Sequence, residues 1–232
     1  MEKKRIAFNA GALPLGIRSL FQGADVYDSS CSELARTLFV DGPKRCYVKI
    51  GTKSALESEA IMGSFLHRHR LSPEPFAYET DDDHDYLVTE AIDGEDGTDP
   101  AFLEQPAKLA FAFGEHLRML HTLPLEGCPY PNRTNELLVE HRSSKIYSPA
   151  TDPVVMHGDY CLPNIILIEF AFRAFIDVGH GGVGDRHYDL TWGLWSLQHN
   201  LKSDAFGDHF LNGYGRTYFD DFNLRYFRNL IR

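Results

Sequence analysis

The spacing of the apolar residues changes about a third of the way along this chain, and this change limits the folds that the chain can adopt. Short segments with alternating apolar positions, separated by turn residues, predict strands at 35–40, 46–50, 76–79 and 86–89. Segments with helical spacing follow at 105–122, 185–199 and 203–219. Strands that precede the helices, rather than alternating with them, predict an α+β fold.

The chain length and one acidic segment suggest two lobes. A helix is predicted within the strand-rich part, over residues 54–69, with Ser54 as its N-cap. The 232 residues allow one large domain or two small ones. The acidic, glycine-containing segment 93–97 is typical of a linker. We therefore predict a lobe at 1–92 with an antiparallel sheet plus a helix, and a mostly helical lobe at 93–232.

The composition argues against several classes of protein. Lys and Arg number 23 against 33 Asp and Glu, and the resulting net charge of −10 argues against a nucleic-acid-binding protein and fits a cationic ligand. The four cysteines form no C-x-x-C pair, which argues against a zinc ribbon and fits reduced thiols in the cytoplasm. The apolar run after Arg5 is interrupted by polar, glycine and proline residues, so we expect no signal peptide. No apolar run reaches the length of about 18 residues that a membrane span needs.

The strongest chemical signal is a His-Gly-Asp sequence whose aspartate is Asp159. It follows a short predicted strand, and Asn164 lies five residues further on. A predicted pair of strands then leads to Asp177, within an Asp-x-Gly sequence. The strands concerned are predicted at 154–156, 165–168 and 172–176. This arrangement can bring two carboxylates and one amide oxygen to one point.

Phosphoryl transfer from ATP needs groups of these types. Mg²⁺ prefers hard oxygen ligands, and one carboxylate and one carbonyl oxygen from the protein suffice because the ion keeps several waters. A separate carboxylate must orient the attacking hydroxyl and accept its proton. We therefore predict Asp159 as the catalytic base, and Asn164 and Asp177 as ligands of Mg²⁺. The alternative is an ordinary polar turn with solvated side chains.

A kinase also needs a lysine on a strand to hold the ATP phosphates and a helix glutamate to hold that lysine. Lys49 lies at the end of the predicted strand 46–50, and Glu59 lies on the next helix. Glu57 competes with Glu59 for this role. A lysine on a strand is also compatible with simple exposure to solvent.

Several segments are similar to the aminoglycoside 3′-phosphotransferase family, which consists of small-molecule kinases with a protein-kinase-like fold. The similar segments are 27–32, 86–90, 94–96, 117–121, 154–164 and 181–190, and the resemblance covers most of residues 20–228. It implies a two-lobed protein-kinase-like fold with ATP and Mg²⁺ as cofactors. It also implies a cationic, aminoglycoside-like substrate and a role in antibiotic resistance.

The resemblance further implies how individual residues contact the nucleotide. Ser30 would contact the phosphates, and Lys49 and Glu59 would form the ion pair beside them. Tyr47 would stack on adenine. The backbone at Thr89 and Ala91 would form hydrogen bonds to adenine. In the second lobe, Asp185 and Asp189 would brace the catalytic loop and the helix that follows it.

The acceptor side departs from the family pattern. Family members carry a helical insert before the catalytic segment that forms much of the aminoglycoside pocket, and here only residues 135–153 occupy that place. Two alternatives therefore stay open. One is a kinase of another small alcohol, of choline, homoserine or macrolide type, and the other is a nucleotide-binding protein that has lost catalysis.

Overall fold

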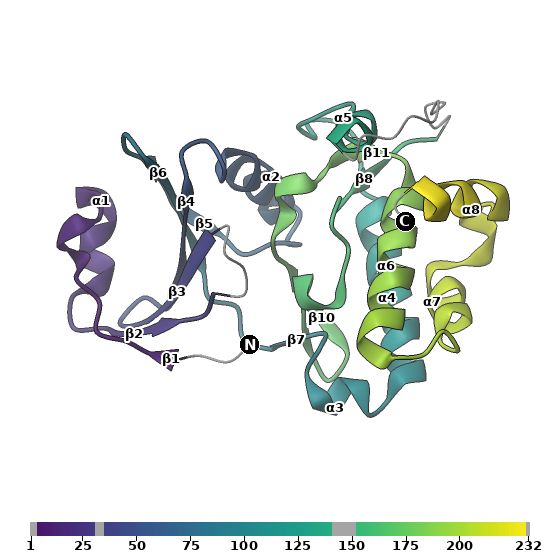
Figure 1. Cartoon of the computed structure of the whole chain (residues 1–232), viewed down its shortest axis with the longest axis horizontal. Helices are drawn as coiled ribbons and strands as arrows, with labels where there is room; N and C mark the ends of the chain where they lie inside the picture. The colour runs from purple at the N-terminus through teal and green to yellow at the C-terminus, as the bar shows by residue number, and fades with distance from the viewer. Residues whose placement is uncertain (1–3, 31–34, 141–151, 231–232) are drawn as a thin grey trace. The chain divides into compact units, whose positions relative to one another are not determined.

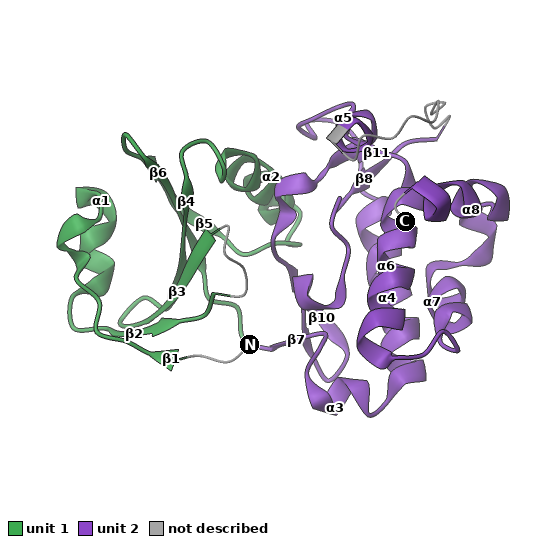
Figure 2. Cartoon of the chain, viewed as in Figure 1, with its two compact units in different colours: residues 1–93 green, residues 94–232 purple. Residues whose placement is uncertain are grey.

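The chain divides into two compact units, residues 1–93 and 94–232, which Figure 2 shows in green and purple. The computed structural model describes residues 4–30, 35–140 and 152–230. Within these ranges, no helix combines the length and the apolar character that crossing a membrane requires.

The N-terminal unit is built on a six-stranded antiparallel sheet in the order β1-β2-β3-β4-β6-β5. The strands are β1 (Lys4–Arg5), β2 (Asp25–Asp28), β3 (Ala35–Asp41), β4 (Cys46–Thr52), β5 (Pro75–Thr80) and β6 (His84–Glu90). The helices are α1 (Leu15–Arg18) and α2 (Glu57–Arg68), with 3₁₀ turns at Ala10–Ala12 and Ser19–Phe21. The four strands expected from the sequence are present, and β1 and β2 extend the sheet beyond them.

The side chains of strand β4 alternate between the two faces of this sheet. Cys46 and Val48 are fully buried and belong to a core cluster that also contains Leu13 and Ile17 from the segment around α1. Because side chains alternate along a strand, Tyr47 and Lys49 lie on the opposite face. The residue beside Lys49 on β6 is Leu87.

Helix α2 packs on the face of the sheet that carries Lys49, since Leu56 and Ala60 form a buried cluster with Leu87. The predicted N-cap of this helix is wrong. Ser54 has a φ of 67°, and the helix begins at Glu57. The fully buried Asp85 on β6 accepts the Leu56 N–H at 3.0 Å and so anchors this end of the helix to the sheet.

The C-terminal unit combines two small antiparallel sheets with six helices among its described residues (Figure 1). The strands are β7 (Glu95–Asp96), β9 (Ile165–Ile168) and β10 (Ala171–Phe175) in one sheet, and β8 (Val154–Met156) and β11 (Gly182–Gly184) in the other. The helices are α3 (Pro100–Leu103), α4 (Pro106–His121), α5 (Arg133–Glu140), α6 (Arg186–Leu201), α7 (Gly207–Tyr214) and α8 (Asp221–Leu230). Three 3₁₀ turns lie at Leu162–Asn164, Val178–His180 and Arg216–Tyr218.

Helices α4 and α7 cross with their backbones in contact. A Cβ atom on Gly114 would lie 2.0 Å from the Phe210 carbonyl oxygen, and one on Gly213 would lie 2.0 Å from the Phe111 carbonyl oxygen. Glycine is therefore required at both positions. The crossing fixes α7 against the middle of α4, at Phe111 and Gly114.

Two expectations for the C-terminal unit need correction. The helix predicted over 203–219 ends at Tyr214, because Gly215 adopts a φ of 98° and a separate 3₁₀ turn follows. The segment predicted as a linker contains β7, whose Glu95 and Asp96 pair with Leu167 and Ile166 of β9. Two residues of pairing are too few to produce a recognisable sequence pattern.

Candidate active site

The loop after β8, residues 157–164, is the candidate catalytic loop, and the first turn of α6 holds it. The Asp189 carboxylate is fully buried and accepts the His157 N–H at 2.6 Å and the Gly158 N–H at 2.8 Å. Gly158 has a φ of 81°, and a Cβ atom there would lie 2.0 Å from the His180 carbonyl oxygen. Glycine is therefore needed at this turn, which presents Asp159 directly after it.

Asp159 and Asn164 are joined across the loop. The Asn164 Nδ2 donates to the Asp159 carbonyl oxygen and to Asp159 Oδ2, each at 3.0 Å. The carboxylate is thus held by an amide donor at a defined distance. Because the amide nitrogen points to Asp159, the amide oxygen of Asn164 points away from it and is available as a ligand.

The pairing of β9 with β10 brings Asp177 to the same place. Phe175 lies opposite Ile165, and the Ile176 N–H donates to the Asn164 carbonyl oxygen at 3.0 Å. Asp177 comes next and adopts a left-handed conformation with a φ of 54°. Such a conformation is uncommon for a residue other than glycine and turns the chain sharply out of the strand.

The Cys161 thiol lies in the loop between Asp159 and Asn164 and is affected by both carboxylates of the site. Burial raises the pKa of Cys161, and the negative charges of Asp159 and Asp177 raise it further. Both carboxylates therefore act on one thiol. A thiol with a raised pKa is a poor nucleophile at neutral pH, so we assign Cys161 no part in the chemistry.

In the N-terminal unit, Lys49 forms an ion pair with Glu59. The Lys49 Nζ lies 2.7 Å from Glu59 Oε2, and the two side chains are 22% and 15% exposed. The packing of α2 on Leu87 brings Glu59 to this distance. Of the two glutamates in the first turn of α2, Glu57 is exposed, so the structure selects Glu59 as the partner.

The other predicted nucleotide contacts lie on the same part of the sheet. Tyr47 is in register with Phe39 and Thr89, and its ring centroid lies 5.2 Å from that of Phe39. The Ala91 N–H donates to the Arg45 carbonyl oxygen at 3.3 Å. The contacts of Tyr47, Thr89 and Ala91 with adenine stay predictions.

Ser30 lies two residues after the end of β2. Its Oγ accepts the Thr37 N–H at 3.0 Å, and its own N–H donates to Asp28 Oδ1 at 3.1 Å. The hydrogen bonds from Ser30 lower the pKa of Asp28. The predicted phosphate contact of Ser30 stays a prediction, and the adjacent Cys31 and Ser32 lie outside the described residues.

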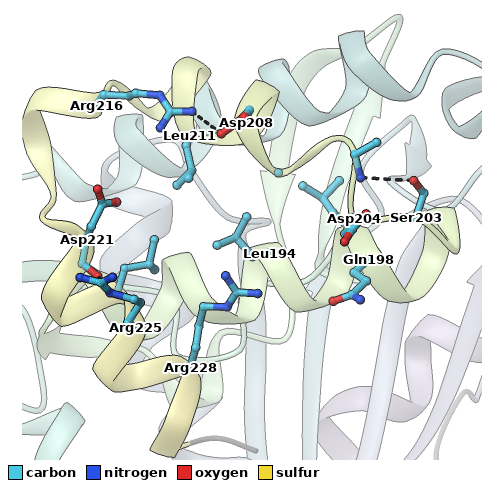
Figure 3. Close-up of a pocket in the computed structure, with 14 residues that line it drawn as sticks. Leu194, Gln198, Ser203, Asp204, Asp208, Leu211, Arg216, Asp221, Arg225 and Arg228 are labelled. Atoms are coloured by element: carbon cyan, nitrogen blue, oxygen red, sulfur yellow. Dashed lines mark hydrogen bonds and ion pairs between the residues drawn. The ribbon is translucent and has the colours of Figure 1, made fainter.

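A pocket of about 600 Å³ lies elsewhere in the C-terminal unit, between α6, α7 and α8 (Figure 3). Leu194, Leu211 and Leu224 contribute apolar surface, and Arg216 at the rim is paired with Asp208. No residue of the catalytic loop or of β8, β9 and β10 lines this pocket. It is therefore separate from the candidate active site.

Comparison with known proteins identifies the family. The model of the phosphotransferase enzyme family matches residues 33–144 and 136–228. The chain belongs to the phosphotransferase enzyme family. A relative from Lactococcus lactis, named probable aminoglycoside 3′-phosphotransferase, is 33% identical over 244 residues, which cover 94% of this chain and 93% of the relative.

Solved structures show that the fold of this phosphotransferase is the one expected. An aminoglycoside 3′-phosphotransferase of type VIII superimposes with a TM-score of 0.69 at 23% identity, covering 99% of this chain and 93% of that one. An aminoglycoside phosphotransferase from Streptomyces rimosus, solved with ADP and streptomycin, gives 0.66 at 21% identity and covers 84% of this chain and 89% of that one. The predicted two-lobed, protein-kinase-like α+β fold is confirmed.

One pair of residues close to the catalytic loop received no role from the sequence. His121 ends α4, and its side chain contacts both Asp189 and Tyr214. The sequence signals were a histidine on the last turn of an amphipathic helix and its place in the family-similar segment 117–121. Such signals do not identify partners that lie 68 and 93 residues away along the chain.

Proposed function

We propose that this chain is an ATP- and Mg²⁺-dependent kinase that transfers the γ-phosphoryl group to a hydroxyl of an aminoglycoside-like aminosugar. The observation that carries the proposal is the grouping of Asp159, Asn164 and Asp177 at the ends of β8, β9 and β10, in a chain of the phosphotransferase family. Phosphoryl transfer needs positioning and charge neutralisation rather than a covalent intermediate. The proposed role of these three side chains is to orient the acceptor hydroxyl and to hold Mg²⁺, whose positive charge offsets that of the phosphates.

Asp159 is the proposed catalytic base. The Asn164 amide holds its Oδ2, which fixes the direction in which the carboxylate meets the acceptor hydroxyl. The hydroxyl oxygen forms a bond to the γ-phosphorus while the bond from that phosphorus to the bridging oxygen of ADP breaks. The hydroxyl proton moves to Asp159.

The amide oxygen of Asn164 and the carboxylate of Asp177 are the proposed Mg²⁺ ligands. They fit the ion because both are hard oxygen donors and because adjacent ends of β9 and β10 carry them. When bound, Mg²⁺ neutralises charge on the phosphates. Lys49, held by Glu59, is proposed to bind the α- and β-phosphates.

An aminoglycoside-like acceptor is favoured by the relatives and by charge. The Lactococcus lactis relative carries an aminoglycoside 3′-phosphotransferase name, and the Streptomyces rimosus enzyme was solved with streptomycin. Aminoglycosides are polycations, and this chain has a net charge of −10. A negative potential attracts such a substrate and raises its rate of encounter.

The test is an ATP-consumption assay against a panel of aminoglycosides, with choline, homoserine and a macrolide as competing acceptors. We expect turnover with at least one aminoglycoside, and a fall of at least about 100-fold in kcat for Asp159→Ala with ATP binding retained. The control is Asp82→Ala, at an exposed turn of the N-terminal unit.

Three results would contradict the proposal. Turnover only with a competing alcohol would replace the acceptor, and undiminished turnover in Asp159→Ala would remove the base. Binding of ATP and Mg²⁺ without turnover on any acceptor would support a protein that has lost catalysis.

A further inference from the structure

Asp189 is the residue on which the catalytic loop depends. Its carboxylate is fully buried and makes three hydrogen bonds, two to the loop N–H groups of His157 and Gly158 and one to His121 Nε2 at 3.1 Å. A buried carboxylate that loses a donor keeps its desolvation cost and shifts toward other partners. The hydrogen bond from His121 therefore helps to set the position of the Asp189 carboxylate, and with it the two bonds to the loop N–H groups.

His121 is held in one orientation. Its side chain is 2% exposed, and burial lowers its pKa, so the imidazole is neutral at pH 7. A neutral imidazole has one N–H and one acceptor nitrogen. Since the Asp189 carboxylate can only accept, Nε2 carries the proton and Nδ1 is left as an acceptor.

Tyr214 completes this chain of hydrogen bonds. Its hydroxyl lies 2.9 Å from His121 Nδ1, and the residue is 1% exposed. Burial raises the pKa of Tyr214 to about 12, so the phenol stays protonated and its O–H donates to Nδ1. The direction of every bond from Tyr214 through His121 to Asp189 is thereby determined.

The position of Tyr214 comes from the close crossing of α4 and α7. Gly213 lies directly before Tyr214 and contacts the backbone of α4 so closely that no side chain fits. Gly114 does the same on the other helix. The backbone packing of α7 on α4 therefore places the phenol beside His121.

We infer that His121 and Tyr214 are positioning residues of the phosphotransferase reaction, which set the catalytic loop through Asp189. This inference rests on the proposed function, because the loop they set carries Asp159. Neither side chain touches the reacting groups. Each acts through the two N–H bonds that Asp189 accepts from the loop.

The experiment compares three variants by kcat, by KM for ATP and by hydrogen exchange of the amides of His157 and Gly158. His121→Phe removes both bonds but keeps a planar ring, His121→Gln restores a donor for Asp189, and Tyr214→Phe removes only the phenol O–H. The control is His116→Phe on the same helix, where the lost contact is with the Phe170 carbonyl oxygen outside the loop.

We expect His121→Phe to lower kcat at least tenfold per folded molecule, with KM for ATP within twofold of the wild type. We expect His121→Gln to recover part of this loss and Tyr214→Phe to lose about threefold. Hydrogen exchange at the amides of His157 and Gly158 should rise most in His121→Phe and less in His121→Gln and Tyr214→Phe. The control should keep kcat and loop exchange within twofold.

A result in which all three variants keep wild-type kcat and loop exchange would overturn the inference, even if their stability falls. No rescue by His121→Gln would also overturn it, because packing alone would then explain the loss. If the wild type shows no turnover on any acceptor, the proposed function fails. In that case, hydrogen exchange alone still decides whether the hydrogen bonds from Tyr214 through His121 to Asp189 position the loop.

Discussion

At the scale of single residues, the candidate site depends on side chains held by specific partners. Asp159 is held by the Asn164 amide, the loop before it by Asp189, and Lys49 by Glu59. Each partner fixes a charged or polar group in one direction. A kinase that works by positioning needs such constraints, because small displacements of the reacting groups cost rate.

The ion pair offers a test with an internal control at this scale. Glu59→Gln removes the charge that holds Lys49, and we expect KM for ATP to rise about tenfold, equivalent to about 1.4 kcal/mol of binding. Glu57→Gln changes the same charge in the same turn of α2 but at an exposed side chain. It should leave KM within twofold. Equal effects in the two variants would contradict the proposed role.

At the scale of elements, α4 and α7 are in backbone contact within the unit that carries the catalytic loop. Both helices use glycine where they meet, and the residues at their ends are His121 and Tyr214. Packing that excludes even a methyl group leaves little freedom for the two helices to slide. The catalytic loop is thus tied to the helical part of its unit.

A methyl group at this crossing should be costly. We expect Gly213→Ala to lower the free energy of unfolding by about 3 kcal/mol, because the added Cβ meets a backbone carbonyl that cannot move aside. Urea unfolding measures the change. Gly207→Ala, at the start of the same helix, meets only the flexible end of Leu194 and should change stability by less than about 1 kcal/mol. A loss for Gly213→Ala no larger than that of the control would show that the crossing is not tight.

At the scale of the whole molecule, the stability should depend on pH through buried histidines. Burial lowers the pKa of His116, His121 and His157, all in the C-terminal unit. In the unfolded chain a histidine has a pKa of about 6.5. The unfolded state therefore binds more protons between that value and the lower folded value, so stability is fully present above pH 6.5 and is lost as the pH falls.

Unfolding by urea at pH 7.5 and pH 5.5 tests this linkage. We expect each of the three histidines to remove up to about 1.4 kcal/mol per pH unit below pH 6.5. His116→Gln should reduce the slope by one proton. A stability that does not fall toward pH 5.5 would show that these side chains accept protons in the folded protein.

The sequence by itself determined the fold class, the strands that carry the chemistry and the His-Gly-Asp segment. These follow from neighbours along the chain, because alternation defines a strand and a fixed spacing defines a loop. Only the tertiary structure decided that Glu59 rather than Glu57 meets Lys49, and that α7 reaches the catalytic loop through His121. Such contacts depend on how helices pack. Packing joins residues that are far apart in the chain, so no local pattern predicts them.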